Sequence, residues 1–210
     1  MVYRAMQVCI LRGTHRYEKG AIKLGHPLVD ELRGRGIDAG LRNVPPFAAD
    51  RHLDRPEDHH MFHDVRARWW RDLVREEKGP IFSLHNYPYD QPVSVTRYRE
   101  ARAIGEVEGP AGKSCVYIIE RTGFLRRLKE GPRSILNTLA QLRRSDRSMW
   151  EDASLFFSSI IEIPAVPDEK DPGHLKVDLE RTEDAGFLGR KVVRTIAEEI
   201  ERITGTGRRH

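Results

Sequence analysis

The sequence predicts a single α/β domain in three layers, with a mostly parallel mixed sheet and helices on both faces. Short apolar runs of strand length alternate along the chain with longer segments of helical periodicity. The 210 residues fall within the usual size of one domain and can bury a substantial core. A hydrophobic fraction of 39% excludes a mostly disordered chain. We therefore treat residues 1–210 as one domain with a polar tail from about residue 204.

The first part of the chain predicts two strand–helix–strand passages. Each apolar run ends near a glycine, a proline or a polar residue, and the helical segments repeat their apolar residues at spacings of three and four. The elements expected here are a strand at 5–11, a helix at 17–33, a strand at 37–44, a helix at 61–77 and a strand at 81–84.

The second part begins with residues 86–112, which contain prolines and glycines and show little periodicity. We expect them to form mainly an extended loop, and a hairpin within this segment is the alternative. The elements expected after it are a strand at 115–119, a helix at 133–143, a strand at 155–163 and a helix at 186–203.

Composition restricts the location and the partners. No apolar run approaches about 20 residues, so we expect no membrane span, and the first residues lack a signal-peptide pattern, so we expect a cytoplasmic protein. Cys9 and Cys115 stand in separate apolar runs, which is typical of buried structural thiols. The 36 basic and 32 acidic residues are spread along the chain, so no nucleic-acid partner is expected. The oligomeric state stays open.

Three residues of metal-ligand type follow two of the predicted strands. His15 and Glu18 form an H-x-x-E pair at the first strand-to-helix turn, and His85 ends the strand at 81–84. Ligands bind at the carboxyl ends of strands in open α/β sheets, and these side chains make up the His₂Glu ligand set of a catalytic zinc site. We expect one Zn²⁺ per chain, with its fourth position left for a water molecule that becomes the nucleophile.

Such a reaction also needs a carboxylate that takes and returns protons. Glu162 stands inside a strongly apolar run at 159–164, where burial is costly unless the charge is used or paired. A structural salt bridge is the other explanation for it. Glu120, directly after the strand at 115–119, is the rival candidate for the base.

These motifs resemble those of the zinc carboxypeptidases and, more closely, of the aspartoacylase and succinylglutamate desuccinylase group. Residues 13–18 match the G-T-H-x-x-E pattern after the first strand, and residues 83–86 match a D-L-H-N strand end, with Ser83 in place of the acidic residue. The resemblance implies a zinc-carboxypeptidase-like fold, zinc bound by His15, Glu18 and His85, and Glu162 as general base.

The same resemblance implies arginines that hold a substrate carboxylate. The family motifs N-P-x-A and D-L-N-R are only echoed, at residues 43–46 and 53–55. Arg55 and, after it, Arg51 are therefore the candidate carboxylate clamps, since a guanidinium can grip a carboxylate with two hydrogen bonds.

Further candidates surround this motif. Asn86, Tyr87 and Tyr89 come directly after His85, so we expect them to contact substrate or an oxyanion. A second group of histidines stands at the start of the helix expected at 61–77, where metal binding is one explanation and an exposed position near a helix N-terminus is the simpler one. It consists of His59, His60 and His63.

The expected reaction is hydrolysis of an amide bond in an N-acyl amino acid or a peptide. N-formylglutamate amidohydrolase, another member of the superfamily, resembles the chain in length and in a short helix that leads into a strand of the D-x-H-S type, so deformylation or deacylation of an N-acyl amino acid is one form of the reaction that the resemblance allows. The alternative is a catalytically inactive binding module on the same fold that engages an anionic partner through its basic surface.

Overall fold

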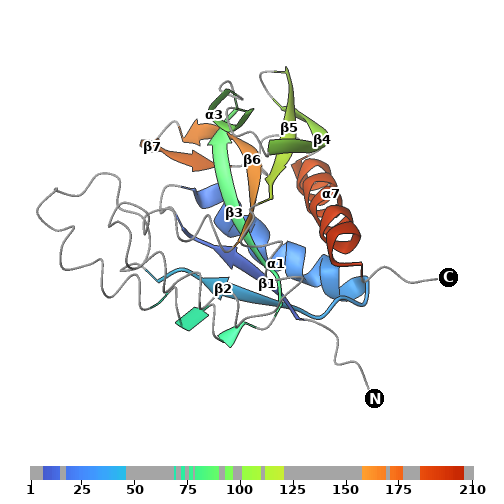
Figure 1. Cartoon of the computed structure of the whole chain (residues 1–210). Helices are drawn as coiled ribbons and strands as arrows, with labels where there is room; N and C mark the ends of the chain where they lie inside the picture. Colours follow the sequence, from blue (N-terminus) through green and yellow to red (C-terminus); the bar gives the residue numbers. More distant parts are fainter. Residues whose placement is uncertain are drawn as a thin grey trace, which may run out of the picture.

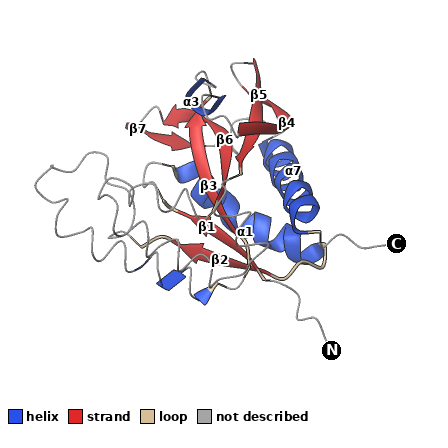
Figure 2. Cartoon of the chain, viewed as in Figure 1, coloured by secondary structure: helices blue, strands red, loops and turns tan. Residues whose placement is uncertain are grey.

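The computed structural model describes residues 7–14, 18–45, 69, 72–73, 76–77, 79–89, 93–96, 101–109, 112–120, 158–168, 171–176 and 185–205. The predicted helix at 133–143 lies outside the described residues, and so does most of the helix at 61–77. Figure 1 shows the arrangement of the elements, and Figure 2 shows their types.

A mixed sheet in the strand order β2-β1-β3-β6-β5-β4 forms the centre of the molecule, and β7 pairs with β6 (Figure 1). The strands are β1 (Val8–Arg12), β2 (Ala39–Asn43), β3 (Ile81–Pro88), β4 (Ala101–Gly109), β5 (Gly112–Ile119), β6 (Ser159–Asp168) and β7 (Asp171–Lys176). Neighbours are parallel from β2 to β6 and antiparallel elsewhere. The α/β class with a mixed sheet is therefore confirmed, but parallel pairing dominates only in the half that contains β1, β2 and β3.

Two long helices cover one face of the sheet. They are α1 (Lys19–Gly34) and α7 (Ala185–Thr204), and a short helix, α3 (Val93–Thr96), follows β3. Both long helices bury residues spaced three and four apart, as the sequence predicts. In one core cluster they meet alternate residues of the strands, among them Ile10, Leu84 and Ile161. None of the described helices is both long and apolar enough to cross a membrane.

The opposite face of the sheet carries a second apolar cluster. Cys9, Leu11 and Ile81 point to this face and pack with Leu73, which is helical, and with the partly buried Trp69. The burial of Cys9 confirms the prediction for this thiol, whereas Cys115 is only half-buried. Helices on both faces, and hence three full layers, stay a prediction.

The segment after His85 differs from the expected loop. β3 continues to Pro88, and residues 101–109 pair with β5 as an antiparallel hairpin. Sequence periodicity missed β4 because it is an edge strand whose side chains alternate only weakly between buried and exposed. Its register also shifts between Ala103 and Gly105, which breaks the period of two.

Candidate metal centre

The predicted site lies where β1 ends and β3 continues. Leu11 of β1 is level with Ser83 of β3. β1 ends at Arg12, whereas β3 continues to Pro88, so His85 lies in the part of β3 that extends past the end of β1. Gly13 follows β1 with a φ of 80°, a conformation that favours glycine, and turns the chain toward α1. Glu18, directly before α1, lies beside the part of β3 that extends past β1.

Glu18 and His85 meet at this place. The Oε2 atom of Glu18 lies 3.4 Å from Nδ1 of His85, and the side chains are only 4% and 3% exposed. Two atoms that each lie roughly 2.0 to 2.2 Å from one tetrahedral ion are about 3.3 to 3.6 Å apart. The observed separation therefore has the length expected for two ligands of a common zinc ion, and it exceeds the usual N–H···O range of about 2.7 to 3.2 Å.

Asn86 explains why the Glu18 carboxylate can face His85. Glu18 is the N-cap residue of α1, yet its side chain makes no capping hydrogen bond. The Asn86 side chain does this instead, since its Oδ1 accepts a hydrogen bond from the backbone N–H of Ala21 at 2.6 Å, and its Nδ2 donates to the Ile163 carbonyl at 3.1 Å. Asn86 is buried, and its hydrogen bonds connect α1, β3 and β6. This residue, predicted to contact substrate, therefore caps α1.

The second ring nitrogen of His85 is also engaged. Its Nε2 atom lies 2.9 Å from Oγ of Ser83, and this hydroxyl lies 3.1 Å from Oγ1 of Thr14. All three side chains are buried. Sequence reasoning gave Ser83 and Thr14 no role, because their proximity depends on the register between β1 and β3.

Electrostatics keep His85 neutral. Burial lowers the pKa of His85, and the nearby Glu162 carboxylate offsets only part of this effect. A neutral imidazole is the form that binds a metal ion, and a buried carboxylate beside it is stabilised by a bound cation.

Glu162 stands next to this pair rather than at a strand end. It lies within β6, where it is the register partner of His85, so both side chains leave the same face of the sheet. Glu162 is partly exposed, as a group that exchanges protons with a substrate must be. Tyr117 of β5 is the register partner of Glu162 on its other side, and no sequence motif pointed to it.

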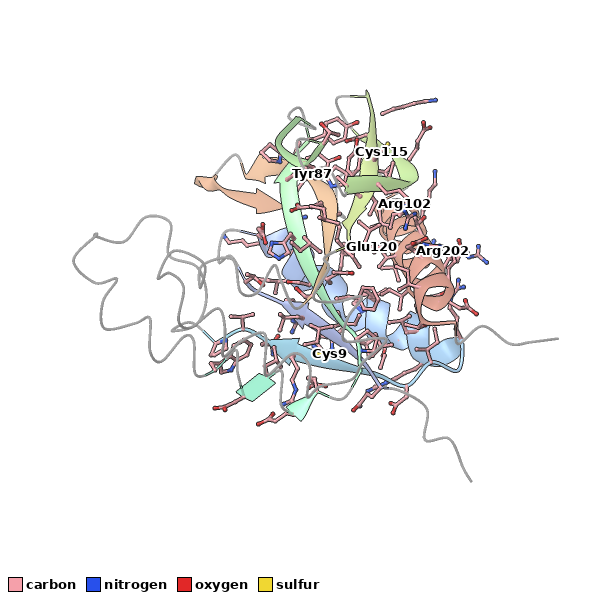
Figure 3. All side chains as sticks on the ribbon, in the orientation of Figure 1. Cys9, Tyr87, Arg102, Cys115, Glu120 and Arg202 are labelled. Carbon is pink, nitrogen blue, oxygen red and sulfur yellow. The ribbon has the colours of Figure 1, made fainter. Side chains whose placement is uncertain are left out.

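Glu120 lies in a different environment. It accepts a hydrogen bond from Arg102 at 3.1 Å and approaches Arg202 to 3.9 Å, and Arg102 and Arg202 also bind Glu199 of α7. Figure 3 shows Glu120 with Arg102 and Arg202 beside α7. This cluster of ion pairs gives Glu120 a structural role and favours Glu162 as the base.

The two predicted tyrosines differ in their surroundings. The Tyr87 hydroxyl lies 2.7 Å from Oγ of Ser114 and donates to the Cys115 carbonyl at 2.6 Å. The rings of Tyr87 and Tyr117 meet at an angle of 65° with their centroids 5.8 Å apart. Figure 3 labels Tyr87 and Cys115. Tyr87 is buried in β3, so its hydroxyl is occupied inside the protein. Tyr89 is half-buried in the turn after β3, where its backbone N–H donates to Ala165, and it is the better placed of the two for substrate.

Several candidates lie outside the described residues. These are His15, Arg51, Arg55 and the histidines His59, His60 and His63. Within the ranges that the structure describes, no group of three His, Cys, Asp or Glu side chains is close enough to hold a metal ion. The described part of the predicted site is therefore the pair Glu18 and His85, to which His15 would add the third ligand.

Comparison of the chain with protein-family models, with curated proteins and with solved structures finds no match in any of the three. The family resemblance consequently depends on the sequence motifs at residues 13–18 and 83–86 alone.

Proposed function

We propose that this protein is a zinc-dependent hydrolase that cleaves an amide bond of an N-acyl amino acid or a peptide, on a three-layer zinc-carboxypeptidase-like fold. The observation that carries the proposal is the 3.4 Å separation between Oε2 of Glu18 and Nδ1 of His85 in a buried position at the carboxyl end of β1. Distance, atom types and location all suit two ligands of one zinc ion.

The chain supplies the ligands and the proton carrier. Glu18 and His85, with His15 as the third ligand, would hold the ion, and a zinc ion bound there would supply a Lewis acid that activates water near neutral pH. Glu162 accepts a proton from that water and returns it to the leaving amine. Its register with His85 supports this role, because directly opposed residues on adjacent strands have Cβ atoms roughly 5 Å apart.

Substrate binding falls to residues near the same edge. Arg55 and Arg51 are the proposed carboxylate clamps, and Tyr89 is the proposed aromatic contact after β3. Asn86 acts chiefly through Ala21, by fixing the start of α1 and thereby the direction of the Glu18 side chain.

The metal site is tested by loading the purified protein with zinc, removing excess ion and measuring bound metal. We expect about one zinc per chain, and loss of binding in His85→Ala and Glu18→Ala. His26→Ala is the matched control, because His26 is an exposed histidine of α1 that contacts Arg12 outside the site. Failure of the wild-type chain to bind zinc, or unchanged binding in His85→Ala, would refute the proposal.

Activity is tested separately on the zinc-loaded protein with a panel of N-formyl, N-acetyl and N-succinyl amino acids and short peptides. We expect turnover of at least one member of the panel that depends on zinc. Bound zinc without any turnover would instead support the inactive binding module, which a salt-dependent interaction with an anionic partner would then establish.

A further inference from the structure

A line of polar contacts leads from the turn after β1 to the candidate metal ligand. The hydroxyls of Thr14 and Ser83 are 3.1 Å apart, and the Ser83 hydroxyl is 2.9 Å from Nε2 of His85. On the other side of the same ring, Nδ1 faces Glu18 at 3.4 Å. A neutral imidazole carries one ring proton, so the hydrogen-bonding partners of its two nitrogens decide which nitrogen keeps a lone pair.

We propose that Ser83 and Thr14 are positioning residues that hold the proton of His85 on Nε2 and thereby direct the lone pair of Nδ1 toward the ion held by Glu18. In this arrangement Nε2–H donates to Ser83, and the Ser83 hydroxyl donates to Thr14. The inference rests on the proposed function, because a cation between Nδ1 and Glu18 is what offsets the repulsion between the lone pair and the carboxylate.

The opposite direction of donation would give a different chemistry. If Thr14 donated to Ser83 and Ser83 donated to Nε2, the ring proton would lie on Nδ1 and would point to Glu18, as in a serine, histidine and carboxylate triad. Two observations disfavour this direction. The contact between Nδ1 and Glu18 is longer than the charge-assisted hydrogen bond of about 2.7 to 2.9 Å that the triad requires, and Ser83 is 1% exposed, which shields it from a substrate.

The hydroxyl pair also has a consequence for charge. Metal-binding histidines commonly donate their second N–H to a carboxylate or another acceptor, which fixes the ring and the tautomer. Ser83 accepts the same hydrogen bond without adding a negative charge beside Glu18. We therefore expect Ser83 to orient His85 without making the site more anionic.

The experiment combines two measurements on Ser83→Ala and Thr14→Val. Long-range ¹H–¹⁵N NMR of the zinc-loaded protein with labelled histidine reports which ring nitrogen of His85 carries the proton, and competition with a chelator reports zinc affinity. Ser159→Ala is a matched control, because Ser159 is an equally buried serine on the adjacent strand β6 whose hydroxyl makes no hydrogen bond among the described residues.

We expect the proton on Nε2 in the zinc-loaded wild-type chain and in Ser159→Ala, and faster exchange of this proton with solvent in Ser83→Ala, where its acceptor is removed. Zinc binding should weaken about 10- to 100-fold in Ser83→Ala and less in Thr14→Val, with no change in the control. Thr14→Val keeps the inference testable if Ser83→Ala fails to fold, since it removes only the outer hydroxyl of the line.

A wild-type proton on Nδ1 would overturn the inference, and covalent labelling of Ser83 by a fluorophosphonate would then indicate the triad. Equal zinc affinity in all variants would also overturn it while leaving the metal site intact. A wild-type chain that binds no zinc would refute the proposed hydrolase and, with it, the ion toward which His85 is directed.

Discussion

His85 of β3 and Glu162 of β6 are register partners on adjacent parallel strands, and their side chains leave the same face of the sheet. This relationship places a proton-carrying group beside the candidate metal ligand without any help from a loop. Glu120 has no such register with His85. Its carboxylate instead accepts a hydrogen bond from Arg102 near α7.

The first prediction compares these two glutamates. Glu162→Gln should retain bound zinc and lose about 10²- to 10⁴-fold in turnover, because the amide cannot accept a proton. Glu120→Gln is the matched control and should keep both properties. Steady-state kinetics with metal analysis on the same preparations measure the effect, and equal activity of both variants would show that the base lies elsewhere.

A second prediction concerns Asn86. Asn86→Ala should lower the free energy of unfolding by about 1 to 3 kcal/mol, because the substitution removes the partners of the Ala21 N–H and the Ile163 carbonyl in a buried place. Chemical denaturation measures this loss. Asn86→Asp keeps an acceptor for Ala21 but no donor for Ile163, so we expect an intermediate stability, and a variant as stable as the wild type would contradict the capping role.

A third prediction tests the approach of α7 to β4. A Cβ atom at Gly105 would lie 2.6 Å from Cγ2 of Thr195, and this β-branched side chain has little freedom to move within a helix. Gly105→Ala should therefore destabilise the protein by about 1 to 3 kcal/mol. Thr195→Ala in the same chain should restore most of the loss, and additive effects in the double-mutant cycle would show that the two positions are not in contact.

The fourth prediction concerns alkaline pH. Burial raises the pKa of Tyr87 to about 12, although the hydrogen bond with Ser114 acts in the opposite direction. The folded state thus holds the phenolic proton more tightly than the unfolded state. The resulting stability is fully present below the ordinary tyrosine pKa of about 10 and is lost as the pH rises toward 12.

Tyr87→Phe should abolish this part of the pH dependence. At neutral pH the variant should be less stable by about 1 kcal/mol, because it loses two hydrogen bonds. Between pH 10 and 11.5 the difference in free energy of unfolding between the two proteins should shrink. The wild-type chain is destabilised there because its unfolded state loses the phenolic proton first, whereas the variant has no such group. Denaturation curves at pH 7, 10 and 11 measure this, and parallel curves for both proteins would contradict the assignment to Tyr87.

Much of the fold could be predicted because local patterns are strong where elements are long or buried. The turn after β1, the helix that ends at Gly34 and the last helix agree with the structure to within about two residues. Prediction failed at β4 and β7, and it ended both β3 and β6 several residues too early. The end of β3 gains its partners from β6, which is distant in the sequence, so its local pattern contains little information about pairing. β4 pairs with the next strand along the chain, but it is an edge strand with a register shift, which weakens its alternation.

By itself, the sequence determined the α/β class, the positions of the main strands and helices, and the choice of Glu18, His85 and Glu162 as chemically notable residues. Only the tertiary structure decided that Glu18 faces His85, that Glu162 is level with it, and that Ser83 and Thr14 reach its second nitrogen. The reason is physical: composition and periodicity fix which residues are buried, whereas strand register and the capping of α1 by Asn86 fix the distances between side chains that are up to 77 residues apart.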